Sequence, residues 1–167
     1  MGNRPKIKVP FEPVDIIVEV ISMTALLLMI IYTIIEYKHL PDMIPTHFNA
    51  QGIADGFSDK SMIWGLPIIG VVIYVGLFIL NKFPHVHNYM VNITEENAFK
   101  NYQFSTRIVR GVSVFTVVLF AYIQYTIIAS AKGENITLGS WFLPTIISLS
   151  LLLPTFILIY QNKINKA

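Results

Sequence analysis

The run VISMTALLLMIIYTII, residues 20–35, contains no charged side chain and decides the fold class of this chain. Apolar residues on both sides extend it to about residues 13–37. A helix needs about 20 apolar residues to cross the hydrocarbon core of a bilayer. Three similar stretches follow, at about residues 62–83, 95–131 and 140–160. The sequence therefore predicts an all-α integral membrane protein with four transmembrane helices in a single membrane domain, residues 1–167.

The composition agrees with a membrane protein and excludes several other classes. Hydrophobic residues make up 54% of the chain and charged residues 13%, whereas soluble domains carry about 25% charged residues. A net charge of +2 gives no support to nucleic-acid binding. The chain has no cysteine, which excludes disulfides and cysteine-based metal centres.

The lysines and arginines predict the orientation, because cytoplasmic segments carry the excess of positive charge. If the N-terminus is inside, nine lie in inner segments: Arg4, Lys6, Lys8, Lys82, Lys100, Arg107, Arg110, Lys163 and Lys166. Three lie in outer segments: Lys38, Lys60 and Lys132. Trp64 and Trp141 then both fall at the outer interface, where tryptophan is enriched. Both observations predict that the two termini are cytoplasmic.

The outer segment between the first two helices, residues 38–61, is long and is expected to carry structure of its own. Residues 44–48 are expected to be extended. Asn49 to Gly52 and Asp55-Gly56 are typical turn residues. We therefore predict a short β-hairpin-like loop over the outer ends of the helices.

Two helix starts have candidate caps. Ser58 or Asp59 is expected to cap the second helix. Thr94, followed by the acidic Glu95, is expected to cap the third, after an inner loop at residues 84–94.

The outer loop holds the densest group of polar residues. Its candidate residues for ligand recognition or for bracing the loop are Asp42, Pro45, His47, Asn49, Gly52, Asp55, Gly56 and Lys60. Gly52 and Gly56 are favoured as turn residues, because glycine tolerates positive φ. Carboxylates and imidazoles such as His39, Asp42, His47 and Asp55 could hold a divalent cation. Their spacing matches no metal signature, so we predict no metal site and no cofactor.

Four charged residues lie at similar depth near the inner membrane face. Asp15 and Glu19 share one face of the first helix, and Arg107 and Arg110 lie on the third. Charges at membrane depth usually pair or face a cavity, so we predict an ion pair between the two helices. Two alternatives are that all four complement helix ends in the headgroup region, or that they line a proton or cation path.

Catalytic motifs are missing from the sequence. It contains no G-x-S-x-G, no H-E-x-x-H, no Walker loop and no dinucleotide-binding glycine pattern. This favours a protein that is not an enzyme.

The outer loop carries a resemblance to a known family. The stretch LPDMIPTHFNAQGIADG, residues 40–56, followed by Lys60, resembles a bacterial family of membrane domains of unknown function. That domain also forms the N-terminal half of SdpI-type toxin-immunity proteins. Asn88-Tyr89 and residues 93–97 resemble its cytoplasmic segment, so the resemblance covers roughly residues 15–110.

The resemblance implies a multi-pass protein of the bacterial cytoplasmic membrane that recognises an extracytoplasmic peptide or toxin. Its partners would be the lipid bilayer, a peptide toxin and a transcriptional repressor held at the membrane. SdpI-type proteins carry a second domain with further helices, which we expect to be missing or reduced here. One alternative is a small transporter or channel-like accessory protein with Asp15, Glu19 and the two arginines along an inner vestibule. Another is a metal-dependent membrane enzyme built on His39, Asp42, His47 and Asp55.

Overall fold

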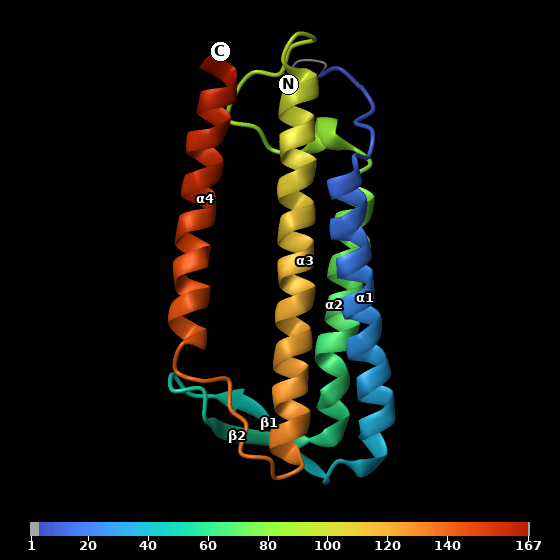
Figure 1. The fold of residues 1–167 in the computed structure, drawn as a ribbon, viewed down its shortest axis with the longest axis vertical. Helices are drawn as coiled ribbons and strands as arrows, with labels where there is room; N and C mark the ends of the chain where they lie inside the picture. The colour runs from blue at the N-terminus through green and yellow to red at the C-terminus, as the bar shows by residue number, and fades with distance from the viewer. Residues whose placement is uncertain (1–3, 167) are drawn as a thin grey trace.

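A computed structural model describes residues 4–166 and confirms four long apolar helices with a two-stranded hairpin between the first two (Figure 1). The helices are α1 (Pro13–Glu36), α2 (Gly65–Leu80), α3 (Ala98–Ala131) and α4 (Phe142–Lys166). The hairpin pairs β1 (Met43–Phe48) with β2 (Ala54–Asp59). Short 3-10 helices are η1 (Tyr37–His39), η2 (Lys60–Trp64) and η3 (Pro84–Val86). All four α-helices, two of them together with the adjoining 3-10 turns, are long and apolar enough to cross a membrane.

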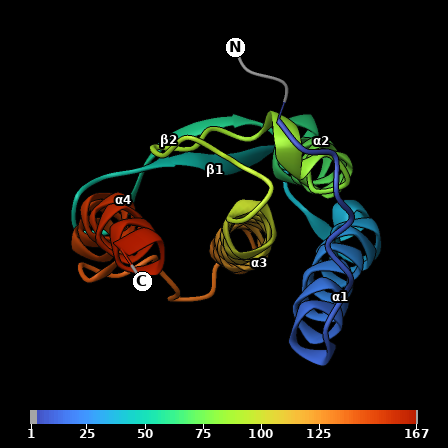
Figure 2. The ribbon, with the colours of Figure 1, turned by 90° about the horizontal axis from the view of Figure 1, so that it is seen from above.

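Helices α1, α2 and α3 form a bundle (Figure 2), with the hairpin at one end and both termini at the other (Figure 1). We call these the hairpin end and the terminal end. Midway along the bundle, Leu26 and Met29 of α1 pack with Val117 of α3. Helix α2 approaches this contact through Gly70, where an added Cβ would lie 3.1 Å from Met29 Cε. The small residue therefore permits the close helix packing that is common within membranes.

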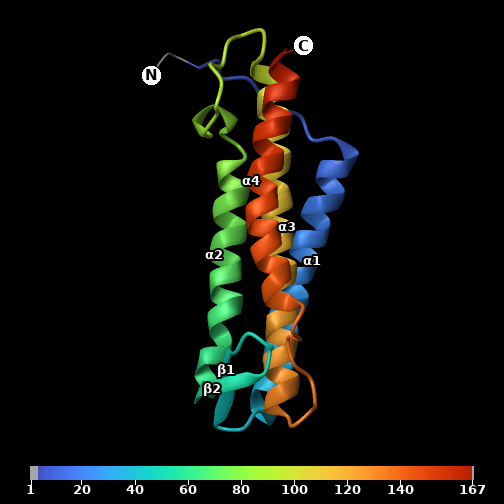
Figure 3. The same cartoon turned by 90° about the vertical axis from the view of Figure 1, so that its left-hand side faces the viewer.

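Helix α4 stands apart from α1 and α2, on the far side of α3 (Figure 2). It runs alongside α3 (Figure 3), but no residue of its most apolar 18-residue window is buried. At the terminal end it is tied down by Asn165, which exchanges amide hydrogen bonds of 2.9 and 3.0 Å with Asn101. Tyr160 also lies 4.7 Å from Phe104 between ring centroids. An apolar helix with so little protein contact is suited to lipid.

The hairpin is anchored on the end of α3. Ile44 of β1 is fully buried with Ile127 and Ile128 of α3, and Leu40 and Ile63 complete this cluster. Trp64 packs on the same cluster. The antiparallel register shifts on both sides of His47, as it does at a β-bulge. Burial of this apolar cluster fixes the hairpin against the bundle.

Several boundaries differ from the expected ones. Helix α2 spans residues 65–80 rather than 62–83, because the chain enters it through η2. Asp59 caps η2, accepting a hydrogen bond of 2.8 Å from the Ser61 backbone N–H. Hydrogen bonds from the Ser61 side chain and backbone hold the pKa of Asp59 below its usual value.

The third helix begins at Ala98 rather than near residue 95, and its N-cap is Asn97, not Thr94. The Asn97 side-chain oxygen accepts from the Thr94 backbone N–H at 2.9 Å, and this bond holds residues 94–97 in a turn outside the helix. Helix α4 begins at Phe142 and continues to Lys166 rather than ending at residue 160. Its last turns contact α3 through Asn165, which a local hydropathy pattern does not reveal.

Candidate functional site

The tip of the hairpin is held by Asn49 and Gly52. The Asn49 side-chain oxygen accepts from the backbone N–H groups of Gln51 and Ile53 at 3.0 and 3.1 Å. Gly52 has φ +76°, and an added Cβ would lie 2.4 Å from the backbone nitrogen of Gly139. The Gly52 carbonyl also accepts from the Leu138 N–H at 3.0 Å. The tip is therefore docked on the loop that precedes α4.

The base of the hairpin is closed by Asp42 and Lys60. Lys60 Nζ lies 3.2 Å from Asp42 Oδ1, and the Lys60 N–H donates to the Asp42 carbonyl at 2.9 Å. Between base and tip, an added Cβ at Gly56 would lie 2.8 Å from His47 Cβ on the opposite strand. Six of the eight loop candidates thus shape the hairpin or lie buried beneath it: Asp42, Pro45, Asn49, Gly52, Gly56 and Lys60.

The remaining two candidates, His47 and Asp55, form an exposed pair. His47 Nδ1 lies 2.5 Å from Asp55 Oδ1, and the two side chains are 73% and 42% exposed. Met43, Ile53 and Phe57 of the same hairpin are each more than half exposed. We call these five residues the hairpin surface. It combines exposed large apolar side chains with a hydrogen-bonded imidazole and carboxylate on one hairpin, and recognition surfaces use residues of these kinds.

The four residues considered as metal ligands do not converge. His47 pairs with Asp55, Asp42 with Lys60, and His39 Nδ1 lies 3.9 Å from Glu36 Oε2. Within residues 4–166, no three histidine, aspartate or glutamate side chains gather as metal ligands would.

At the terminal end the structure brings Asp15, Glu19, Arg107 and Arg110 together. Arg110 Nη1 lies 3.2 Å from Asp15 Oδ1, and Arg110 Nε lies 3.3 Å from Glu19 Oε1. Arg107 Nε lies 3.5 Å from Asp15 Oδ1, and its Nη2 lies 2.5 Å from Glu12 Oε2. We call these five residues the ion cluster. The residue that sequence reasoning missed is Glu12, although Glu12, Asp15 and Glu19 share the i, i+3, i+7 spacing of one helix face.

The centre of the ion cluster is almost fully buried. Asp15 is 3% exposed and Arg110 5%. Asp15 also accepts from the Glu12 backbone N–H at 2.9 Å, which caps α1. The Phe11 ring stacks on the Arg110 guanidinium at 4.4 Å. Buried charges in such surroundings depend on their partners, so the cluster links the start of α1 firmly to α3.

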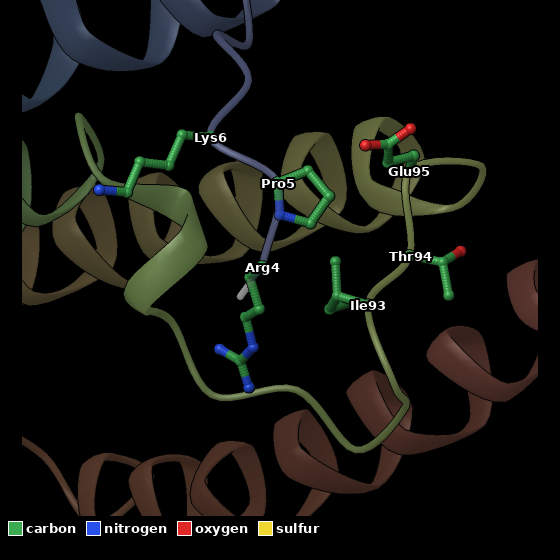
Figure 4. Close-up of a pocket in the computed structure, with 6 residues that line it drawn as sticks. All are labelled: Arg4, Pro5, Lys6, Ile93, Thr94 and Glu95. Atoms are coloured by element: carbon green, nitrogen blue, oxygen red, sulfur yellow. The ribbon is translucent and has the colours of Figure 1, made fainter. Parts of the chain in front are cut away.

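Two of the cavities at the terminal end are lined by residues of the N-terminal segment. One, of about 250 Å³, is lined by Glu19 and Arg110 together with Lys8, Asn81 and Lys82. The other, of about 470 Å³, lies between residues 4–6 and 93–95; Figure 4 shows Lys6 and Glu95 at its opposite sides. Its Arg4 is already engaged, because Nη1 donates to the carbonyls of His85 and His87 at 3.1 and 2.7 Å.

A third polar contact holds the inner loop on α3. His87 Nε2 lies 3.1 Å from the Leu80 carbonyl and Nδ1 lies 2.7 Å from Ser105 Oγ. A carbonyl can only accept, so Nε2 carries the proton and Nδ1 accepts from the Ser105 hydroxyl. Burial lowers the pKa of His87 and raises that of the neighbouring Tyr89 to about 12. Both side chains are therefore neutral at physiological pH.

Comparison with known proteins gives a domain but no activity. Residues 24–71 match the family described as a domain of unknown function, DUF1648. This segment runs from within α1 through the hairpin into α2. An uncharacterized protein of Archaeoglobus fulgidus is 25% identical over 129 residues, which cover 68% of this chain and 70% of that protein. No solved structure matches this chain. The four apolar helices indicate a multi-pass membrane protein, one segment of which is similar to DUF1648.

Proposed function

We propose that this chain is a non-enzymatic receptor that recognises an extracytoplasmic peptide or peptide toxin with the hairpin surface. The proposal rests on the difference between the loop residues that hold the hairpin in shape and those that form an exposed pair on it. Six candidate residues serve the shape of the hairpin, among them Asp42, whose side chain is 92% exposed but pairs with Lys60. His47 and Asp55 form an exposed pair on the hairpin that also carries the exposed Met43, Ile53 and Phe57. A rigid loop loses little conformational entropy on binding, so its exposed apolar side chains can contribute fully to affinity.

Helix α3 supplies a route from this surface to the cytoplasm. Its Ile127 and Ile128 lie beneath the hairpin, and its Arg107 and Arg110 lie in the ion cluster at the other end. One continuous helix of 34 residues thus connects the two regions. A ligand that shifts the hairpin would act on the ion cluster through α3, where a transcriptional repressor could respond.

Two further considerations support this proposal. The family match includes the whole hairpin, and the motif of residues 40–56 resembles that of SdpI-type immunity proteins. The positive charges favour cytoplasmic termini in a bacterial inner membrane, which places the hairpin outside, where a secreted peptide arrives.

The test uses a deletion strain of the source organism, complemented with the wild-type chain or with variants. The readout is growth inhibition by the peptide fraction of the organism's own conditioned medium, with a protease-treated fraction as the blank. His47→Ala and Phe57→Ala remove exposed groups of the hairpin surface and should restore sensitivity. The matched control is Gln51→Ala, because Gln51 is also exposed on the hairpin and contributes only its backbone to the tip.

Asn49→Ala serves a separate purpose, because it removes two hydrogen bonds within the tip. It should lower both protection and folded yield, whereas His47→Ala and Phe57→Ala should leave folded yield unchanged. Equal sensitivity of the deletion and wild-type strains to the peptide fraction would contradict the proposal. So would full protection by the His47 and Phe57 variants.

A further inference from the structure

The cavity of about 250 Å³ at the terminal end has an unusual charge distribution. It lies between residues 7–11, α1, α2 and α3. Lys8 and Lys82 line it, both are exposed, and neither makes an ion pair with any residue of the range 4–166. Its carboxylate, Glu19, is already matched by Arg110 at 3.3 Å and by the Tyr74 hydroxyl at 3.4 Å. Two ammonium groups therefore remain without a counter-charge.

The inner wall of the cavity includes Asn81, whose buried Oδ1 acceptor has no hydrogen-bond partner within residues 4–166. Arg110, a side chain that is 5% exposed, already directs its Nε to Glu19 Oε1 at 3.3 Å. A buried donor or acceptor left unpaired costs about 1–3 kcal/mol. The cavity is thus complementary to a ligand that brings a hydroxyl or amine hydrogen to Asn81 Oδ1 and an anionic group to the two lysines.

Apolar side chains complete the lining. Ile7, Phe11 and Phe78 face the same cavity, and Phe11 is 51% exposed. A cavity that combines cations, one free acceptor and an apolar rim at the end of a transmembrane bundle fits an amphiphile. Basic pockets between transmembrane helices bind the headgroups of anionic lipids by the same chemistry.

We propose that this cavity binds a phospholipid whose headgroup carries both a phosphate and hydroxyl groups, as phosphatidylglycerol does. The phosphate oxygens accept from Lys8 and Lys82. A headgroup hydroxyl donates to Asn81 Oδ1. The acyl chains leave along the apolar rim into the adjoining leaflet. This proposal is independent of the peptide recognition proposed for the hairpin.

The test is thermal unfolding of the purified full chain in a neutral detergent, titrated with four probes. These are dioctanoyl phosphatidylglycerol, dioctanoyl phosphatidic acid, dioctanoyl phosphatidylcholine and inorganic phosphate. The lysine variant is K8Q/K82Q. Its matched control is K100Q/K163Q, which removes two exposed positive charges from the same end without touching the cavity. A third variant, Asn81→Leu, keeps the branched shape of the side chain and removes the unpaired oxygen together with the Nδ2 donor to the Thr106 carbonyl.

We expect phosphatidylglycerol to stabilise the wild-type chain, with an apparent Kd that weakens about 30-fold in K8Q/K82Q and less than about threefold in K100Q/K163Q. Asn81→Leu should remove the preference for phosphatidylglycerol over phosphatidic acid while both lysines stay in place. The comparison of the two lipids in Asn81→Leu therefore tests headgroup binding in the cavity even if K8Q/K82Q fails to fold. Equal losses in the two lysine pairs would mean general surface attraction and would overturn the proposal. Equal effects of phosphatidylcholine, or of inorganic phosphate alone, would overturn it too.

Discussion

Asp15→Asn should destabilise this protein by about 3 kcal/mol, because it removes one partner of a buried ion pair. Breaking a buried pair costs about 3–5 kcal/mol, since the remaining charge loses its compensation. In Asp15→Asn, Arg110 still has Glu19 as an ion-pair partner at 3.3 Å. The expected loss of stability is therefore at the lower end of that range. Asparagine at this N3 position retains a side-chain oxygen that can accept from the Glu12 N–H, as a capping box requires. The change therefore isolates the charge.

A double-mutant cycle with Arg110→Met separates the ion pair from its surroundings. Arg110→Met alone leaves Asp15 buried with Arg107 only, at 3.5 Å, and should cost a similar amount. The double variant should be more stable than the sum of the two single changes predicts, with a coupling energy of about 2 kcal/mol. The double variant leaves neither partner of the Asp15–Arg110 pair as an uncompensated charge. Glu19 loses Arg110 in both Arg110 variants, so that loss cancels in the cycle.

The assay is reversible unfolding by SDS in mixed micelles, followed by far-ultraviolet circular dichroism and by tryptophan fluorescence. Glu95→Gln is the matched control, because Glu95 is an exposed carboxylate at the same end and should shift stability by less than about 0.5 kcal/mol. A free energy for Asp15→Asn within about 0.5 kcal/mol of wild type would refute the reasoning. Strict additivity in the cycle would refute it as well.

Two other predictions concern the docked tip and the inner loop. Gly52→Ala should lower the free energy of unfolding at least twice as much as Gly133→Ala in the same assay. Both residues have positive φ, so alanine brings a strain of about 1–2 kcal/mol at either position. Of the two, only Gly52 would also place the new Cβ against backbone atoms, those of Gly139. Similar losses at both positions would show that the tip is not docked. The lowered pKa of His87 means that the folded state binds fewer protons than the unfolded state below about pH 6.5, so stability should hold above that pH and fall as the pH drops through it. His87→Gln should flatten this part of the pH profile, and an unchanged slope would argue against a buried neutral imidazole.

The sequence carried most of the information about local elements. The uncharged run at residues 20–35 and its three counterparts predict the spans, because each segment must satisfy its own backbone hydrogen bonds in lipid. Turn residues at 49–52 and 55–56 predict the hairpin, because positive φ and side-chain capping are local properties. The predicted helix ends were less accurate. Helix α4 extends to Lys166, and its last turns contact α3 through Asn165 and Asn101, which are 64 residues apart in the sequence. A local sequence pattern does not contain such a contact.

The candidate site shows the same division. The sequence alone identified the loop motif and the four charged residues at the inner face, because clusters of polar residues stand out between long apolar stretches. Only the tertiary structure decided that Asn49, Gly52 and Gly56 serve the hairpin while His47 and Asp55 remain exposed. That distinction depends on which atoms lie within a few ångströms across strands and loops. Burial and close contact are properties of the packed chain, so they appear only after the helices and the hairpin have come together.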